Sequence, residues 1–168
     1  MCWIAHIRES PSETVAGMWE WTATTRANAT PEQVLHALTH PEEIRRWSPI
    51  DFDLDELEGR RLTAGARGRV NGKLAGVSVG FDLEVHAADE ARLELSAHGP
   101  VGFDVRYDLT VDDAGAELSA RVSMRRNGGL TGRLVANATA ALFSAGALEG
   151  AAGRIAEIAE SQPRALAA

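Results

Sequence analysis

Apolar and polar residues alternate strictly along residues 101–111, VGFDVRYDLTV, where every odd position is apolar or aromatic. A period of two is typical of a strand with one solvated face and one buried face. The same period recurs elsewhere, in residues 19–27, 50–55, 73–85, 93–97 and 118–124. Because turn residues separate most of these segments, the pattern predicts an antiparallel meander of about six or seven strands.

Asn71-Gly72 is the strongest short hairpin signal in the chain, since both residues tolerate the backbone of a two-residue turn. A turn there pairs Val70 with Lys73, and this register agrees with the hydrophobic pattern. The buried face of the following strand then consists of Ala75, Val77, Val79, Phe81, Leu83 and Val85.

Two short helices are predicted after the first strand. Thr30-Pro31-Glu32-Gln33 combines a capping threonine, a proline at the first helical position and a glutamine that can complete a capping box. The second helix, residues 41–47, begins with proline and acids and ends with arginines, as the helix dipole favours. Ser48-Pro49 ends it.

After Asn127-Gly128-Gly129 the period becomes helical and predicts one helix of about 30 residues, roughly 45 Å long. Gly146, Gly150 and Gly153 lower its helix propensity and indicate either a bend or close packing. Its predicted buried stripe consists of Leu130, Leu134, Asn137, Ala141, Ser144 or Ala145, Leu148, Ala152, Ile155 and Ala159. A sheet with one apolar face needs a cover. We therefore expect an α+β fold in which the curved sheet wraps around this helix.

The order of elements resembles the START-like (SRPBCC) helix-grip superfamily, which includes the Bet v 1-like allergens and the polyketide cyclase/dehydrase-like proteins. The resemblance covers residues 18–162 and leaves residues 1–17 as an extension, flexible or packed on the surface, and 163–168 as a tail. It rests on ATPEQVLHAL, HPEEIRRWSP, LTAGARGRV and GALEGAAGRIAEIAES. The last segment also resembles the carbon monoxide dehydrogenase-related branch of the superfamily. The superfamily implies a hydrophobic ligand between sheet and helix.

A cavity at that place would be lined by the apolar face of the sheet and the small residues of the helix. Small side chains opposite a curved sheet either approach it closely or leave a void, and a large void suggests a ligand site. Phe81, Phe103, Tyr107, Leu142 and Phe143 could instead fill much of the space. The expected lining is Trp47, which the resemblance places at one lip, with Val79, Phe81, Leu83, Leu95, Phe103, Val105, Tyr107, Asn137, Ala141, Ser144 and Ala145.

Polar residues predicted in this interior are few. Tyr107 either orients a bound ligand or is a core tyrosine whose hydroxyl bonds to the protein. Asn137 either donates to a ligand carbonyl or lies at the margin of the helix stripe. The predicted apolar face has no Asp, Glu, His or Arg in its central strands, so the sequence favours binding over acid–base catalysis. Two alternatives stay open: a polyketide cyclase or dehydratase that uses Tyr107 with Asn137, and an interaction module without a ligand.

The composition of the chain further limits the classes of partner that it can bind. A net charge of −7 and a pI near 5.2 disfavour nucleic acid, which needs clustered Lys and Arg. Apolar runs are too short for a membrane span, and the single cysteine, Cys2, fits a reducing cytoplasm. His36 and His40 have helical metal-ligand spacing without an accompanying glutamate, so we expect neither metal nor cofactor. A small hydrophobic molecule is the expected partner, with a homodimer or a protein partner left open.

Overall fold

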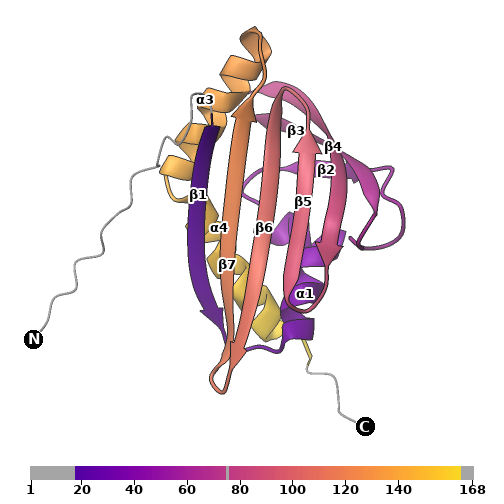
Figure 1. The fold of residues 1–168 in the computed structure, drawn as a ribbon, viewed down its shortest axis with the longest axis vertical. Coiled ribbons are helices and arrows are strands. Elements are labelled where there is room, and N and C mark those ends of the chain that lie inside the picture. Colours follow the sequence, from indigo (N-terminus) through magenta and orange to yellow (C-terminus); the bar gives the residue numbers. More distant parts are fainter. Residues whose placement is uncertain (1–17, 75, 164–168) are drawn as a thin grey trace, which may run out of the picture.

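The alternating segments of the sequence form the strands of one antiparallel sheet. The structure, a computed structural model, describes residues 18–74 and 76–163, so the predicted extension and most of the predicted tail lie outside the described residues. Seven strands lie in the order β1-β7-β6-β5-β4-β3-β2 (Figure 1). Consecutive strands from β2 to β7 pair with each other, and β1 pairs with β7. The expected α+β helix-grip architecture is confirmed.

The elements follow the predicted order closely, with one additional helix. The strands are β1 (Met18–Ala27), β2 (Phe52–Asp55), β3 (Arg67–Leu74), β4 (Val77–Ala88), β5 (Arg92–His98), β6 (Val101–Asp112) and β7 (Gly115–Arg126). The helices are α1 (Pro31–Thr39), α2 (Pro41–Trp47), α3 (Leu130–Ser144) and α4 (Ala147–Ser161). In Figure 1, α4 runs diagonally behind the sheet, with α1 beside its lower end. The sheet therefore holds α4 against its apolar face.

The capping box predicted for the first short helix is present. Thr30 Oγ1 accepts a hydrogen bond from the Gln33 amide at 3.3 Å, and Gln33 Oε1 accepts one from the Thr30 amide at 2.9 Å. The Gln33 side chain also donates to the Gln162 carbonyl oxygen at 2.6 Å. This contact joins the start of α1 to the end of α4, so the local cap also fixes a tertiary contact.

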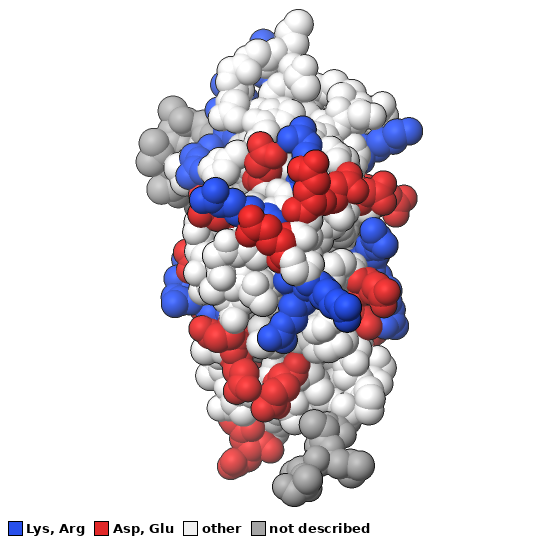
Figure 2. Space-filling view, turned by 90° about the vertical axis from the view of Figure 1, so that its right-hand side faces the viewer, with Lys and Arg blue, Asp and Glu red and all other residues white. Residues whose placement is uncertain are grey.

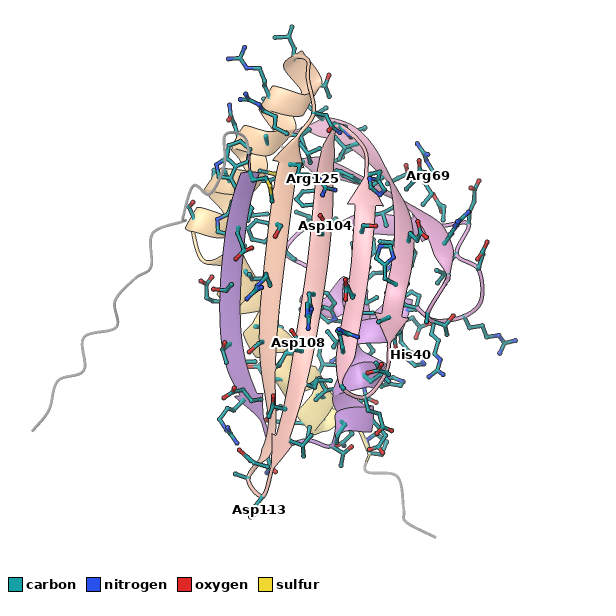
Figure 3. The ribbon with its side chains drawn as sticks, in the orientation of Figure 1. His40, Arg69, Asp104, Asp108, Asp113 and Arg125 are labelled. Carbon is teal, nitrogen blue, oxygen red and sulfur yellow. The ribbon has the colours of Figure 1, made fainter. Side chains whose placement is uncertain are left out.

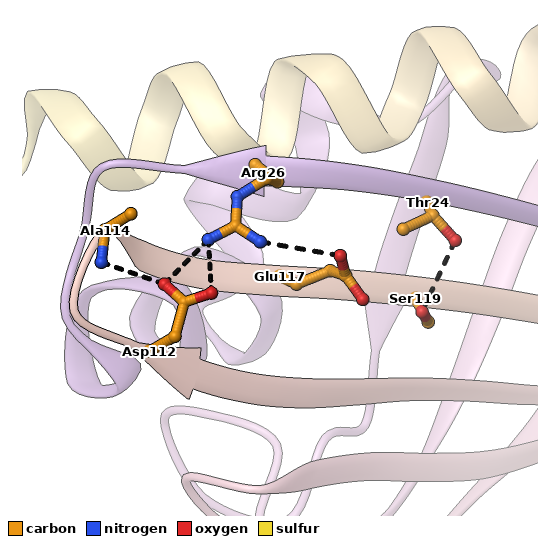
Figure 4. Close-up of polar contacts among 6 residues, drawn as sticks. All are labelled: Thr24, Arg26, Asp112, Ala114, Glu117 and Ser119. Carbon is orange, nitrogen blue, oxygen red and sulfur yellow. Dashed lines mark hydrogen bonds and ion pairs between the residues drawn. The ribbon is translucent and has the colours of Figure 1, made fainter.

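The first strand is fastened to the β6–β7 hairpin by a surface ion pair. Arg26 donates to both carboxylate oxygens of Asp112, at 2.7 and 2.6 Å, and lies 3.6 Å from Glu117 (Figure 4). The Arg26 hydrogen bond, with one from the Ala114 amide, lowers the pKa of Asp112. Since these side chains are exposed, the contact fixes register more than it adds stability.

The Asn71-Gly72 hairpin is the first prediction that the structure corrects. Both residues lie inside β3, and the chain turns only after Leu74, where Gly76 has a φ of 77°. Val70 therefore faces Phe81 instead of Lys73. Asn71 and Gly72 pair with strands on both sides, and this pairing overrides their turn preference. The turn is displaced by an even number of residues, so the same side chains of β4 stay on the buried face. Val79, Phe81, Leu83 and Val85 are buried as predicted. Val77 is half-buried, and Ala75 lies outside the described residues.

The second correction concerns the C-terminal helix, which is two helices. The axes of α3 and α4 differ by 62°. Gly146 separates them with a φ of 92° and a ψ of 21°, in the left-handed region that favours glycine. Neither helix alone is long and apolar enough to cross a membrane in the described part of the chain, and the two meet that test only as a bent pair. The break gives α3 and α4 independent buried faces.

The bend shifts the buried stripe of α3. Leu148, Ala152, Ile155 and Ala159 of α4 are buried as predicted. In α3 the buried residues are instead Gly132, Val135, Ala136 and Thr139. Gly132 permits a close approach, since a Cβ there would lie 2.8 Å from the Pro100 carbonyl oxygen and 2.6 Å from that of Asn127. This contact seats the first turn of α3 on the β5–β6 turn and rotates the predicted stripe, Asn137 included, to the outside.

We expect Gly146→Ala to lower the free energy of unfolding by about 1 kcal/mol, because alanine is strained at a left-handed position. Gly150→Ala is the matched control: residue 150 is exposed within α4, and nothing lies within 4 Å of an added Cβ. That change should raise stability by up to about 1 kcal/mol through helix propensity. Thermal unfolding of both variants measures the difference in stability. Equal shifts in the same direction would contradict the requirement for glycine at the break.

Candidate functional site

A cavity of about 250 Å³ lies between the apolar face of the sheet, α2 and the bend between α3 and α4. An engineered protein cavity of about 150 Å³ holds benzene. On that scale this cavity accommodates a molecule of roughly two fused rings. Residues from β2 to β7 form one wall, and residues from α1 to α4 and the segments after α2 and β2 form the other.

Most of the residues predicted to line the interior do lie on the cavity wall. They are Trp47, Phe81, Leu83, Leu95, Phe103, Val105 and Tyr107. Val79 is buried in a neighbouring cluster and is not part of the wall. The sheet residues were found because strand parity alone decides which side chains face inward.

The helix residues predicted for the interior are placed on the outside. Asn137, Ala141, Ser144 and Ala145 are all exposed, so their predicted place in the lining is wrong. The helical wall consists instead of Thr139, Leu142, Phe143, Leu148 and Ala151. The signal that could have found them was Gly146, because a break there permits α3 to rotate independently of α4.

Trp47 forms a fixed part of the wall. Its indole Nε1 donates to the Ala37 carbonyl oxygen at 2.8 Å, and its ring lies edge-on to Tyr107 with centroids 6.1 Å apart. The residues just after it, Ser48, Pro49 and Ile50, line the cavity and are half-buried. These three residues form the partly exposed edge of the cavity, next to the predicted lip residue.

Tyr107 carries its hydroxyl to the apolar side of the sheet, as its odd position in β6 predicts. The side chain is 5% exposed, and burial raises the pKa of the phenol above its ordinary value near 10. Within the described residues its hydroxyl makes no hydrogen bond to the protein. At neutral pH Tyr107 is therefore an uncharged donor and acceptor at the cavity wall.

Thr139 supplies a second hydroxyl, which sequence reasoning missed. The residue is 3% exposed, and its Oγ1 has no hydrogen-bond partner in the described part of the chain. A helical threonine can bond to the carbonyl one turn earlier, and most buried hydroxyls have a partner, so an unpartnered one at a cavity wall is unusual. Ser48 differs, because its Oγ already donates to the Ile50 carbonyl oxygen at 2.8 Å.

No charged side chain of the described residues lies on the cavity wall. The lining formed by residues 18–74 and 76–163 contains no Asp, Glu, His, Lys or Arg. Charged residues of the sheet, including Asp104, Asp108 and Arg125, project from the opposite face (Figure 3). General acid–base catalysis works best with groups whose pKa is near neutrality, and no such group faces this cavity. The arrangement suits an uncharged ligand held by apolar contacts and two hydroxyls.

The histidine pair with metal-ligand spacing lies outside the cavity wall. The rings of His36 and His40 stack with centroids 3.7 Å apart, and His40 Nδ1 is 3.1 Å from the His36 carbonyl oxygen. No third metal-binding side chain joins them among the described residues. Burial, followed by the charge of His40, lowers the pKa of His36. Its buried Nδ1 has no partner within residues 18–74 and 76–163.

The fold and the cavity together define a helix-grip protein with an apolar interior site. The family described as "Polyketide cyclase / dehydrase and lipid transport" matches residues 18–160. The chain belongs to this family, and the resemblance drawn from its sequence motifs is confirmed. A search of curated proteins gives no match.

Solved structures show the same fold at low identity. CV1439 from Chromobacterium violaceum has a TM-score of 0.62 and 15% identity, covering 85% of this chain and 99% of its own. Ara h 8.0201 has a TM-score of 0.59 and 15% identity, covering 87% of this chain and 100% of its own. DynU16, from the dynemicin biosynthetic locus, has a TM-score of 0.55 and 22% identity, covering 84% of this chain and 47% of its own. These likenesses establish the fold alone.

We expect Thr139→Val to raise the free energy of unfolding of the ligand-free protein by about 1–3 kcal/mol, because valine removes an unpaired buried hydroxyl at nearly constant volume. Urea denaturation measures the change. Thr131→Val is the control, since Thr131 is exposed on the same helix. A loss of stability at position 139 greater than in the control would show that the hydroxyl has a stabilising partner.

The lowered pKa of His36 predicts a pH dependence of stability. The unfolded chain binds a proton at His36 more readily than the folded protein, so this residue's contribution is lost as the pH falls below about 6.5. We expect His36→Gln to reduce the decline in unfolding free energy between neutral and mildly acidic pH. Exposed His98 provides the control variant His98→Gln, and equal slopes in both variants would refute the assignment.

Proposed function

We propose that this protein binds a small, uncharged, largely hydrophobic molecule in the cavity between the sheet and the bend of α3 and α4. The observation that carries this proposal is the cavity of about 250 Å³, apolar except for hydroxyls and one indole. Of its polar groups, Tyr107 and Thr139 make no hydrogen bond through their side chains within the described residues. A ligand would supply those missing partners.

The energetics favour an apolar ligand with one polar edge. Burying apolar surface contributes about 25 cal/mol per Å², from which the cost of ordering the ligand is subtracted. Two hydroxyls that both donate and accept suit a ligand carbonyl or hydroxyl. A site with buried polar groups discriminates against analogues that leave those groups unpaired. An aromatic or polyketide-like compound with one or two oxygens, or a small lipid, meets these conditions.

Catalysis is the weaker alternative. The family description includes cyclases and dehydrases, and the neutral Tyr107 could polarise a bound carbonyl through a hydrogen bond. The cyclase hypothesis relied on Asn137 in support, but that side chain is exposed on α3. A site without an ionisable group near neutrality supports binding better than proton transfer. An interaction module without a ligand is also less well supported, because the interior is not filled by side chains.

The cellular setting is a separate proposal. The cytoplasmic location rests on the single cysteine and stays a prediction, as does a homodimer or a protein partner.

We expect the protein to bind 2-naphthol, a probe with two fused rings and one hydroxyl, measured by fluorescence titration. Val105→Phe fills the cavity from its half-buried position in β6 and should weaken binding at least roughly tenfold, because the site loses volume. Val111→Phe is the matched control, since Val111 lies on the same strand, is 53% exposed and is not part of the cavity wall.

Equal affinity in the two variants would refute the assignment of the cavity. Native mass spectrometry of gently purified protein provides a second readout, in which the wild type and Val111→Phe should carry a small co-purified molecule that Val105→Phe lacks. Thermal unfolding of each variant shows that it remains folded.

A further inference from the structure

One end of the molecule exposes large apolar side chains close together. Among the described residues, the exposed large hydrophobic residues are Met18, Val111, Leu130 and Leu134. Leu130 is 83% exposed and Leu134 is 46% exposed, and their spacing places them on one face of α3. Met18 pairs with Arg125 and so lies at the same end of the sheet. Only Val111 lies elsewhere, near the far end of β6.

The first turns of α3 rise above the upper end of the sheet in Figure 1. We call residues 126–134, from the end of β7 to the first turns of α3, the α3 tip. The Asn127 side chain donates to the Gly99 carbonyl oxygen at 2.7 Å, which ties the tip to the β5–β6 turn. This anchor and the close approach at Gly132 hold the two leucines outward.

The charge around the α3 tip is opposite in sign to that of the whole chain. The chain has 24 acidic and 17 basic residues, yet residues 118–148 contain no Asp or Glu and four arginines. Two of these, Arg121 and Arg125, approach Glu20 at 3.8 Å and Asp104 at 2.8 Å. Arg126 and Arg133 are exposed and pair with no carboxylate within the described residues. In Figure 2 the upper end of the molecule is white and blue, and red side chains begin lower down.

We propose that the α3 tip docks on an anionic lipid surface. Leu130 and Leu134 would enter the boundary between headgroups and acyl chains, where an amphipathic helix face buries its apolar side. Arg126 and Arg133 would contact the phosphates, since long basic side chains bury their stems and keep their charges at the polar interface. The small apolar surface makes this docking weak, reversible and sensitive to salt.

A lipid surface fits the α3 tip better than a second copy of the chain. A two-fold contact through the same patch would bring Arg126 and Arg133 of one copy close to those of the other, without a carboxylate from residues 118–148 to offset them. An anionic bilayer offers the opposite charge together with an apolar interior. Self-association is therefore the outcome that the experiment must separate from membrane binding.

Docking would bring the cavity close to the membrane. The inner half of α3 carries Thr139, Leu142 and Phe143 on the cavity wall. Leu134 and Leu142 are separated by about 12 Å along the helix. This consequence rests on the proposed ligand binding, but docking itself requires no ligand, so the two proposals can fail separately.

The test is co-sedimentation of the full chain with vesicles of phosphatidylcholine, with and without phosphatidylglycerol. We expect binding only to the vesicles that contain phosphatidylglycerol, and its loss at high salt. Arg126→Gln/Arg133→Gln should reduce partitioning roughly 30-fold at low salt, since each arginine contributes about a fivefold factor near an anionic surface. Leu130→Ser/Leu134→Ser should reduce it roughly tenfold or more by removing the inserted side chains.

Matched controls lie elsewhere on the surface. Arg60→Gln/Arg61→Gln makes the same charge change in an exposed loop, and Val111→Ser removes the exposed hydrophobic residue at the opposite end. Both controls should partition like the wild type, and all variants should retain the wild-type thermal unfolding and 2-naphthol affinity. The proposal would be overturned if the controls and the α3-tip variants lost vesicle binding equally. It would also be overturned if the wild type bound no better to vesicles that contain phosphatidylglycerol than to those that lack it. A dimer in sedimentation equilibrium that Leu130→Ser/Leu134→Ser dissociates, without vesicle binding, would assign the patch to self-association.

Discussion

The change of helix direction at Gly146 is the constraint on which the interior of this protein depends. A straight helix over residues 130–160 would present one continuous stripe to the sheet. With a 62° bend, α4 packs along the apolar face while α3 turns toward the end of the sheet. The cavity lies between the sheet and the bend, lined on its helical side by Leu142, Phe143 and Leu148 near the break. A left-handed residue is therefore required where the two packing directions meet.

Because of the same bend, α3 turns one face toward the cavity and the other toward solvent. We call these the inner and the outer face. The inner face places Thr139 at the cavity wall, and its hydroxyl has no partner among the described residues. The outer face exposes Leu130 and Leu134 beside unpaired arginines, judged over the described part of the chain. Burying an unpaired hydroxyl and exposing large apolar side chains both cost free energy. Such features are consistent with selection for binding, because stability alone would remove them.

The chemistry available to the family depends on the lining of each member more than on the fold. Structures at 15–22% identity share this architecture, so the fold alone does not specify a ligand. In this chain the cavity wall combines aliphatic and aromatic side chains with a tyrosine whose pKa is raised by burial. A neutral phenol on an apolar wall can donate and accept a hydrogen bond, and it carries no charge at neutral pH.

The sequence by itself determined the features that depend on short-range rules. Strand parity placed Phe81, Val105 and Tyr107 on the cavity side, and the capping box set the start of α1. The tertiary structure decided features that depend on contacts between distant segments. Asn71-Gly72 favours a turn locally, yet pairing with β2 and β4 keeps it extended. Asn137 fits a helical stripe, yet packing of Gly132 on the β5–β6 turn places it outside and Thr139 inside, because a helix's orientation is set by what it packs against.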